Sequence, residues 1–134
     1  MKLDFAFLAD AAEVVNGKLY VMGGSFDTLW AKTMPLIHPR LSLVLKLQFT
    51  PSELDRNHKL EITLINADGQ KIANVTGDIQ PGKNPKTPSG YPHNFISVVN
   101  FNNLQLKVHG DYSFEILANN TSLVSLPLRV SPVA

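Results

Sequence analysis

A strict alternation between positions 41 and 49 constrains the fold of this chain more than any other feature. Every odd position there carries leucine or phenylalanine, and three of the four even positions are polar: Ser42, Lys46 and Gln48. Successive side chains of a β-strand point to opposite faces, so the large apolar groups share one face. This segment is therefore predicted to be a half-buried strand.

Two tight turns predict hairpins with defined registers. Asn16-Gly17 and Asp68-Gly69 separate alternating segments, and both dipeptides accept the positive φ angles of two-residue hairpin turns. The first turn would pair residue 15 with 18, 14 with 19 and 12 with 21. The second would pair 62 with 75, 63 with 74 and 64 with 73.

A further pair of strands is predicted at the C-terminal end. Apolar residues at 112, 114 and 116, and again at 126, 128 and 130, must face the same way, which requires an odd number of residues between the two strands. Residues 119–121 are the expected three-residue loop. Pro127 cannot donate to a sheet ladder, so the last strand is expected at an edge or with a bulge.

The remaining segments complete an all-β fold. Residues 95–106 are apolar on both faces and are expected to form a central strand, whereas residues 51–55 offer only one helical turn. With 134 residues, 44% of them hydrophobic, the chain suits a single domain over 1–134. We expect an antiparallel β-sandwich of about eight strands, with a closed barrel as the rival. The expected inward set is Leu43, Leu45, Ile62, Leu64, Tyr112, Phe114, Leu126 and Leu128.

Residues 110–114 resemble the tyrosine corner of immunoglobulin-like domains, in which a tyrosine follows a turn glycine at the start of a late strand. More broadly, the chain resembles a family of small uncharacterised bacterial proteins in residues 16–24, 38–41, 67–69, 110–114 and 126–130. The resemblance implies a bacterial source and one sandwich domain. It implies no activity and no binding residues.

Charge and composition exclude several classes of partner. A formal charge of +1 is far from the basic surface that nucleic acid binding requires, and the chain has no cysteine for disulfides or thiolate metal sites. Acidic residues at 4, 10 and 13 interrupt the apolar N-terminal segment, which therefore lacks the core of a secretory signal. The expected protein is cytoplasmic, without a nucleic acid or membrane partner.

Motifs of catalysis are missing from the sequence. There is no phosphate-binding loop, no Gly-x-Ser-x-Gly and no His-Glu-x-x-His, so we expect no enzyme, no cofactor and no metal. The histidines at 38, 58, 93 and 109 are expected to face solvent from loops. A metal site assembled from His58, His93 or His109 with Asp27, Asp55 or Asp111 is the alternative.

The best candidates for recognition lie in and around a proline-rich loop, residues 80–94. Tyr91 and His93 at its end are the expected exposed contacts. Trp30, with Phe26 and Tyr20, could form a stacking platform, although core packing is the expected role of Trp30.

Apolar residues on outward-facing positions suggest that one face of the sandwich is covered. These residues are Val44, Ile65, Ile72 and Leu117. They predict a non-catalytic protein-interaction module that pairs with itself as a homodimer or with another protein, with Ile65 and Ile72 in the contact. The alternative is a small-ligand or carbohydrate-binding module that uses Trp30 and Tyr91.

Overall fold

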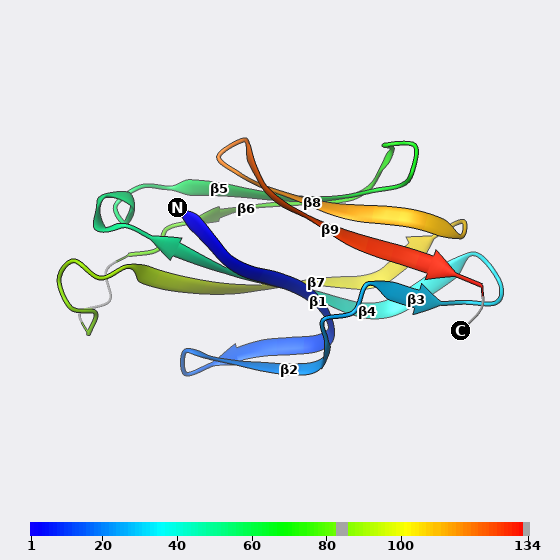
Figure 1. Ribbon diagram of the computed structural model, residues 1–134, viewed down its shortest axis with the longest axis horizontal. Coiled ribbons are helices and arrows are strands. Elements are labelled where there is room, and N and C mark those ends of the chain that lie inside the picture. The colour runs from blue at the N-terminus through cyan, green and yellow to red at the C-terminus, as the bar shows by residue number, and fades with distance from the viewer. Residues whose placement is uncertain (83–85, 133–134) are drawn as a thin grey trace.

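A computed structural model describes residues 1–82 and 86–132, which form nine strands and one short 3-10 helix (Figure 1). The strands of the first half are β1 (Lys2–Val15), β2 (Lys18–Gly24), β3 (Thr28–Trp30), β4 (Leu36–Phe49) and β5 (His58–Ile65). Those of the second half are β6 (Lys71–Ile79), β7 (His93–Leu106), β8 (Gly110–Ala118) and β9 (Thr121–Ser131). The 3-10 helix, η1, spans Pro51–Glu53, as the single predicted turn.

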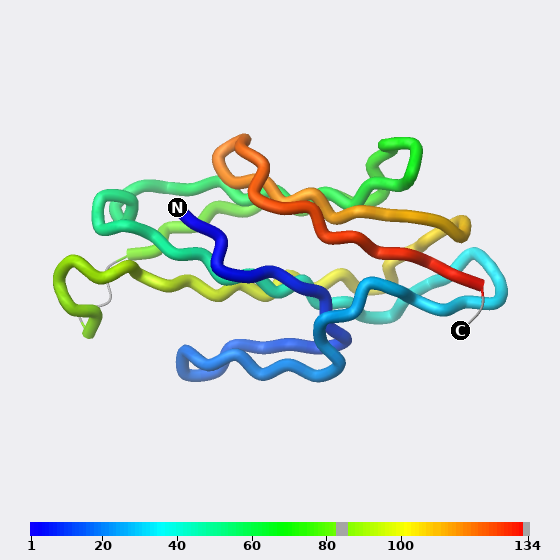
Figure 2. Tube along the Cα trace, in the orientation of Figure 1, coloured from blue at the N-terminus to red at the C-terminus, as the bar shows by residue number. Residues whose placement is uncertain are grey.

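The strands form two sheets that face each other, so the predicted sandwich is confirmed and the closed barrel is not (Figures 1 and 2). One sheet has the order β2-β1-β4-β7 and the other β3-β9-β8-β5-β6. The pairs are antiparallel except that β3 runs parallel to β9. β3 pairs with β9 only at Arg129–Ser131. Pro127 precedes this part, where the outer side of β9 has no neighbouring strand of the described chain, so the missing N–H of Pro127 leaves no unmade ladder bond there.

The core lies between the two sheets and contains the predicted inward residues. Leu43, Leu45, Leu64 and Phe114 have no exposed surface, and Ile62, Tyr112 and Leu128 are also buried, whereas Leu126 is half-buried against the same cluster. The ring of Phe101 on β7 packs on that of Phe114 on β8, with centroids 5.2 Å apart. Period-two alternation was therefore sufficient to predict the packed faces of β4, β5, β8 and β9.

The predicted pairs of both hairpins are confirmed away from the second turn. In the first hairpin, Val15 pairs with Lys18 and Ala12 with Val21; in the second, Ile62 pairs with Val75 and Leu64 with Ala73. At the second turn the predicted two-residue loop is wrong: Asn66 N–H donates to the Gln70 carbonyl, so residues 67–69 form a three-residue loop, and a bulge restores the predicted register beyond it.

The C-terminal hairpin differs from the prediction. Its turn has two residues, because Ala118 pairs with Thr121. Leu117 pairs with Ser122 and Ile116 with Val124, so β9 has one extra residue in a bulge, and this residue satisfies the parity requirement.

Strand β7 lies at the edge of its sheet, so the prediction of a central strand was wrong. Its outward aliphatic residues are still only half-exposed. Val98 pairs with Val44 of β4, and Val44 has no exposed surface. β7 thus carries apolar residues on both faces because its outer face is also partly buried, and not because it is a central strand.

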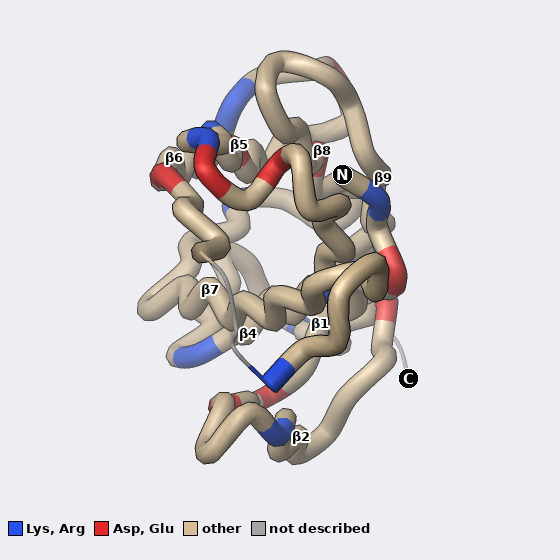
Figure 3. The backbone as a smooth tube through the Cα atoms, turned by 90° about the vertical axis from the view of Figure 1, so that its left-hand side faces the viewer, with Lys and Arg blue, Asp and Glu red and all other residues tan. Residues whose placement is uncertain are grey.

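The β1–β2 hairpin lies on this outer side of the sheet (Figures 1 and 3). The first half of β1 pairs with β4 as far as Ala9, and the second half leaves β4 and pairs only with β2. Figures 1 and 3 show the hairpin beneath the layer of β1, β4 and β7. A Cβ on Gly24 would come within 3.4 Å of the Phe7 ring, so β2 returns close to the outer face of the sheet. The prediction that Val44 points into a partner was wrong, because this chain buries it.

The turn η1 gives the fold a measurable response to acid. The N-terminal ammonium of Met1 binds the carboxylate of Glu53, and Thr50 N–H donates to the same carboxylate at 2.9 Å. These contacts lower the pKa of Glu53 from its ordinary 4.5 to about 2, the ammonium hydrogen bond being the largest cause. The folded state therefore binds fewer protons than the unfolded state, and this stabilisation is lost as the pH falls from about 4.5 to about 2.

Glu53→Gln is accordingly expected to lower the free energy of unfolding by about 1 kcal/mol at pH 7. Urea unfolding of protein beginning at Met1 should show the two stability curves converging below pH 4.5. Glu13→Gln, at an exposed site on the hairpin, is the control and should change little at any pH. A gap between Glu53→Gln and wild type that stays constant down to pH 2 would contradict the ion-pair account.

Candidate functional site

The aromatic residues predicted to bind a ligand do not lie together. Trp30 ends β3, and Tyr91 lies in the segment between β6 and β7, at the other end of the sandwich (Figure 1). Trp30 is 56% exposed and Tyr91 61% exposed, so the expectation of core packing for Trp30 was wrong. β3 has only three residues and lies at the edge of its sheet, so little of the described chain packs against the Trp30 ring. Phe26 packs against the core, and Tyr20 is exposed on the hairpin.

The proline-rich loop runs from 80 to 92 in the structure, because β7 already begins at His93. Residues 83–85, which include Lys83 and Pro85 of the predicted loop, lie outside the described residues. His93 pairs with Phe49 across β4 and β7, and its Nδ1 atom is buried without a hydrogen-bond partner among the described residues. His93 is therefore a half-buried strand residue and not the exposed residue that was predicted, while Tyr91 is exposed and its role in recognition stays a prediction.

Two histidines predicted to face solvent hold the fold together instead. His58 is 4% exposed, and its ring lies 5.0 Å from the Phe49 ring. Asn119 Oδ1 accepts from Lys59 N–H, so the amide nitrogen of Asn119 donates to His58 Nδ1 at 3.0 Å. Nε2 must then carry the proton and donate to the Glu53 carbonyl at 2.8 Å. The half-buried His109 contacts the Ala31 carbonyl through Nε2 at 2.7 Å.

These histidines do not assemble with acids. Within residues 1–82 and 86–132, no three His, Cys, Asp or Glu side chains are grouped so that they could hold a metal ion. No helix in the same part of the chain is long and apolar enough to cross a membrane. The expected absence of a metal and of a cofactor stays a prediction.

The two isoleucines predicted to face a partner are positioned differently by a β-bulge. Leu64 pairs with Ala73, but Ile65 pairs with Lys71, so Ile72 is the extra residue of the bulge. Ile72 consequently turns inward and packs, half-buried, against the core. Ile65 and Leu117 are half-buried as well. The outward apolar surface predicted at Ile65, Ile72, Val44 and Leu117 is thus not a continuous exposed patch.

The exposed apolar surface is concentrated on the β1–β2 hairpin. Among residues 1–82 and 86–132, five of the ten exposed large hydrophobic side chains lie there: Val14, Val15, Tyr20, Val21 and Met22. Register places Val15, Tyr20 and Met22 on one face and Val14, Leu19 and Val21 on the other. The first face is the more exposed, with Met22 at 73% and Tyr20 at 56%, so it looks into solvent. We call the five exposed residues, Val14, Val15, Tyr20, Val21 and Met22, the hairpin patch; they occupy both faces of the hairpin.

The edge of β2 is open as well. β2 ends its sheet, and among the strands of the described chain it pairs with β1 alone. Its only charged residue is Lys18 at its first position, so it lacks the charges that usually protect an edge strand. A depression of about 460 Å³ lies next to the patch, between Tyr20, Met22 and Arg40 of β4.

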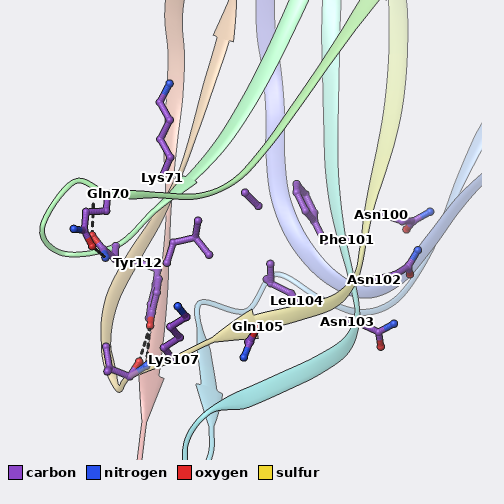
Figure 4. A pocket seen from close by; sticks show the side chains of 14 residues that line it. Gln70, Lys71, Asn100, Phe101, Asn102, Asn103, Leu104, Gln105, Lys107 and Tyr112 are labelled. Atoms are coloured by element: carbon purple, nitrogen blue, oxygen red, sulfur yellow. Dashed lines mark hydrogen bonds between the residues drawn. The ribbon is translucent and has the colours of Figure 1, made fainter.

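A second hollow lies between β6 and β7, the edge strands on the side of the sandwich away from β2. Its volume is about 600 Å³, and it is lined by the β5–β6 turn, the second half of β7 and Tyr112 of β8. Figure 4 shows Phe101 and Leu104 pointing from β7 toward the side of Tyr112, while Asn100 and Asn102 point the other way. Ser42 Oγ donates to Asn100 Oδ1 at 2.6 Å, which places this amide on the outer face of the sheet. We call this hollow the β6–β7 cleft.

The tyrosine of the predicted corner closes one end of the cleft. Tyr112 O–H donates to the carbonyl of Val108, four residues upstream, at 2.6 Å, and its oxygen accepts from Val108 N–H at 3.4 Å. The hydroxyl is thus satisfied locally, and the ring is left to form an apolar wall.

Sequence reasoning missed both surfaces for different reasons. The sequence predicts correctly that the hairpin residues form strands, but it does not indicate that β1 stops pairing with β4 at Ala9 and projects from the sheet. For the cleft, the run Asn100-Phe101-Asn102-Asn103 was an available signal, since successive amides interrupt the alternation of an otherwise apolar strand. Asn103 has a φ of 53°, a conformation that asparagine tolerates and that departs from regular strand geometry.

Comparisons with known proteins place the chain by family and not by activity. Among solved structures, similar ones are a β-glucuronidase from glycoside hydrolase family 2 and a putative β-galactosidase from Bacteroides fragilis. They are 14% and 17% identical with TM-scores of 0.37 and 0.38; each match covers 71% of this chain but only 10% and 15% of the other chain. No curated protein matches the sequence. The model of a family of unknown function, DUF6941, matches residues 4–131, and the chain therefore belongs to this family.

Proposed function

We propose that this protein is a non-catalytic interaction module whose partner is a second copy of the same chain, bound through the hairpin patch and the open edge of β2. The observation that carries the proposal is the gathering, on one projecting hairpin, of half of the exposed large hydrophobic side chains in the described part of the chain. Exposed apolar groups that cluster on a single-domain protein mark interaction surfaces, whereas isolated ones are normal.

A second copy fits this surface because an edge strand can pair with itself. Two β2 strands related by a two-fold axis would run antiparallel and satisfy each other's unpaired backbone groups. An antiparallel register centred on Val21 places Tyr20 opposite Met22 of the second copy and Lys18 opposite its Gly24. This register brings no like charges together and pairs an aromatic ring with a thioether.

The covered surface must also be large enough. A stable interface buries at least about 1,000 Å², so backbone pairing of one short strand needs support from side chains. The hairpin patch supplies aromatic and methionine side chains, which are enriched at the centres of interfaces. The depression beside Arg40 offers room for a side chain of the second copy.

Disulfide trapping tests the proposed register directly. The chain contains no cysteine, so Val21→Cys introduces a single thiol at the proposed two-fold axis. Opposed residues of antiparallel strands have Cα atoms about 4.5 to 5.5 Å apart, within the range of a disulfide. Mild oxidation is expected to convert most of the protein to a covalent dimer.

Val75→Cys is the matched control for this experiment. Val75 lies on the edge strand β6 and is 37% exposed, against 38% for Val21. It should remain largely monomeric under the same oxidation. Equal crosslinking of the two variants, or none in Val21→Cys, would contradict the proposed interface.

The immunoglobulin-like relationship, the bacterial source and the cytoplasmic location are part of the same proposal. The bond from Tyr112 O–H to the Val108 carbonyl supports the first, because a tyrosine corner makes this local contact. The structural roles of His58 and His109 support a non-catalytic protein, since both rings are engaged with backbone carbonyls.

A further inference from the structure

The β6–β7 cleft is a second surface, on the opposite side of the molecule from β2 by strand order. β6 and β7 end their sheets at the same side and do not pair with each other, so the sandwich is open between them (Figure 3). The volume of about 600 Å³ lies within the usual range for small-molecule sites.

The inner part of the cleft is apolar. Phe101, Leu104 and Tyr112 are each less than 10% exposed, and Ile72 and Ala73 of β6 are half-buried opposite them. The three buried residues form the floor of the cleft, and Ile72 and Ala73 provide its more accessible apolar wall. The cleft favours an apolar body that enters between the sheets over a polyhydroxylated one.

The rim of the cleft is positively charged. Lys71 and Lys107 flank it from β6 and from the end of β7 (Figure 4), and both are exposed. Neither forms an ion pair with a described residue, and the described lining contains no aspartate or glutamate. Gln70 and Gln105 add neutral hydrogen-bonding groups at the same rim.

From these observations we infer that the β6–β7 cleft binds a free anionic amphiphile, an apolar alkyl or aryl body that carries a carboxylate. The apolar body packs between the sheets on Phe101, Leu104 and Tyr112. The carboxylate stays at the rim, where Lys71 and Lys107 provide the only charged groups of the described lining.

Calorimetric titration with decanoate tests this inference. Decanoate is expected to bind with a dissociation constant below about 1 mM, as its size allows. Decyltrimethylammonium, which has an alkyl chain of similar length and the opposite charge, should bind at least about tenfold more weakly. No binding of decanoate, or equal binding of both amphiphiles, would overturn the inference.

Three variants locate the site. Lys71→Glu combined with Lys107→Glu should weaken decanoate binding at least about tenfold, whereas Lys2→Glu combined with Lys32→Glu, with the same change in net charge at exposed sites, should change it less than about twofold. Ala73→Trp, at a half-buried cleft residue, should abolish binding while circular dichroism confirms the fold. Equal effects of the two charge reversals would overturn the inference.

The outcome is separable from the proposed self-association. Tyr20→Lys combined with Met22→Lys alters the hairpin patch and is expected to leave decanoate binding unchanged. Loss of binding in this variant would place the amphiphile on the hairpin and overturn the assignment to the cleft.

Discussion

Replacing both Tyr20 and Met22 with lysine is expected to weaken self-association at least about 100-fold and leave a folded monomer. Both side chains are more than half exposed, so the substitutions remove little packing from the chain itself. In the proposed dimer position 20 lies opposite position 22 of the second copy, so four like charges replace apolar contacts around the two-fold axis. Sedimentation velocity over a concentration series measures the change.

Ile37→Lys combined with Val75→Lys is the control for this variant. These residues are 58% and 37% exposed and lie outside the hairpin, so the control adds the same charge at another part of the surface. It should associate as the wild type does. A control that dissociates to the same extent would show that net charge, not the hairpin patch, governs association.

The second large effect concerns stability. His58→Ala is expected to lower the free energy of unfolding by about 3 kcal/mol and the midpoint of thermal unfolding by roughly 10 °C. The substitution removes a buried ring from Phe49 and leaves the Glu53 carbonyl and the Asn119 amide without this partner. These contacts join η1, the start of β5 and the β8–β9 turn.

Two further variants separate the causes. His58→Phe restores the ring volume but not the hydrogen bonds, and should still be about 2 kcal/mol less stable than wild type. His109→Ala removes one hydrogen bond from a half-buried ring and should cost about 1 kcal/mol. A His58→Phe variant as stable as wild type would mean that packing alone accounts for the role of His58.

Much of the fold could be predicted because turn chemistry and side-chain parity are local. Asn16-Gly17 fixes the register of its hairpin within a few residues, and parity predicts the packed faces of β4, β5, β8 and β9. Parity does not say where an extra residue is inserted. Ile72 was misplaced for this reason, since the bulge beside Ile65 turns it toward the core.

The candidate sites depend on relations that the sequence does not contain. The burial of Val44 and the exposure of Tyr20 both follow from the point at which β1 leaves β4, and this point depends on long-range packing. Trp30 was expected inside because large aromatic residues are usually buried, but its burial is decided by its place on a short edge strand. The β6–β7 cleft likewise exists only because two edge strands from different sheets lie at the same side.

Sedimentation velocity of the wild-type chain, from low to high micromolar concentration, tests the central claim most directly. The hairpin patch and the open edge of β2 predict a reversible equilibrium between monomer and dimer, with the dimer dominant at high micromolar concentration. A chain that remains monomeric throughout this range would contradict self-association.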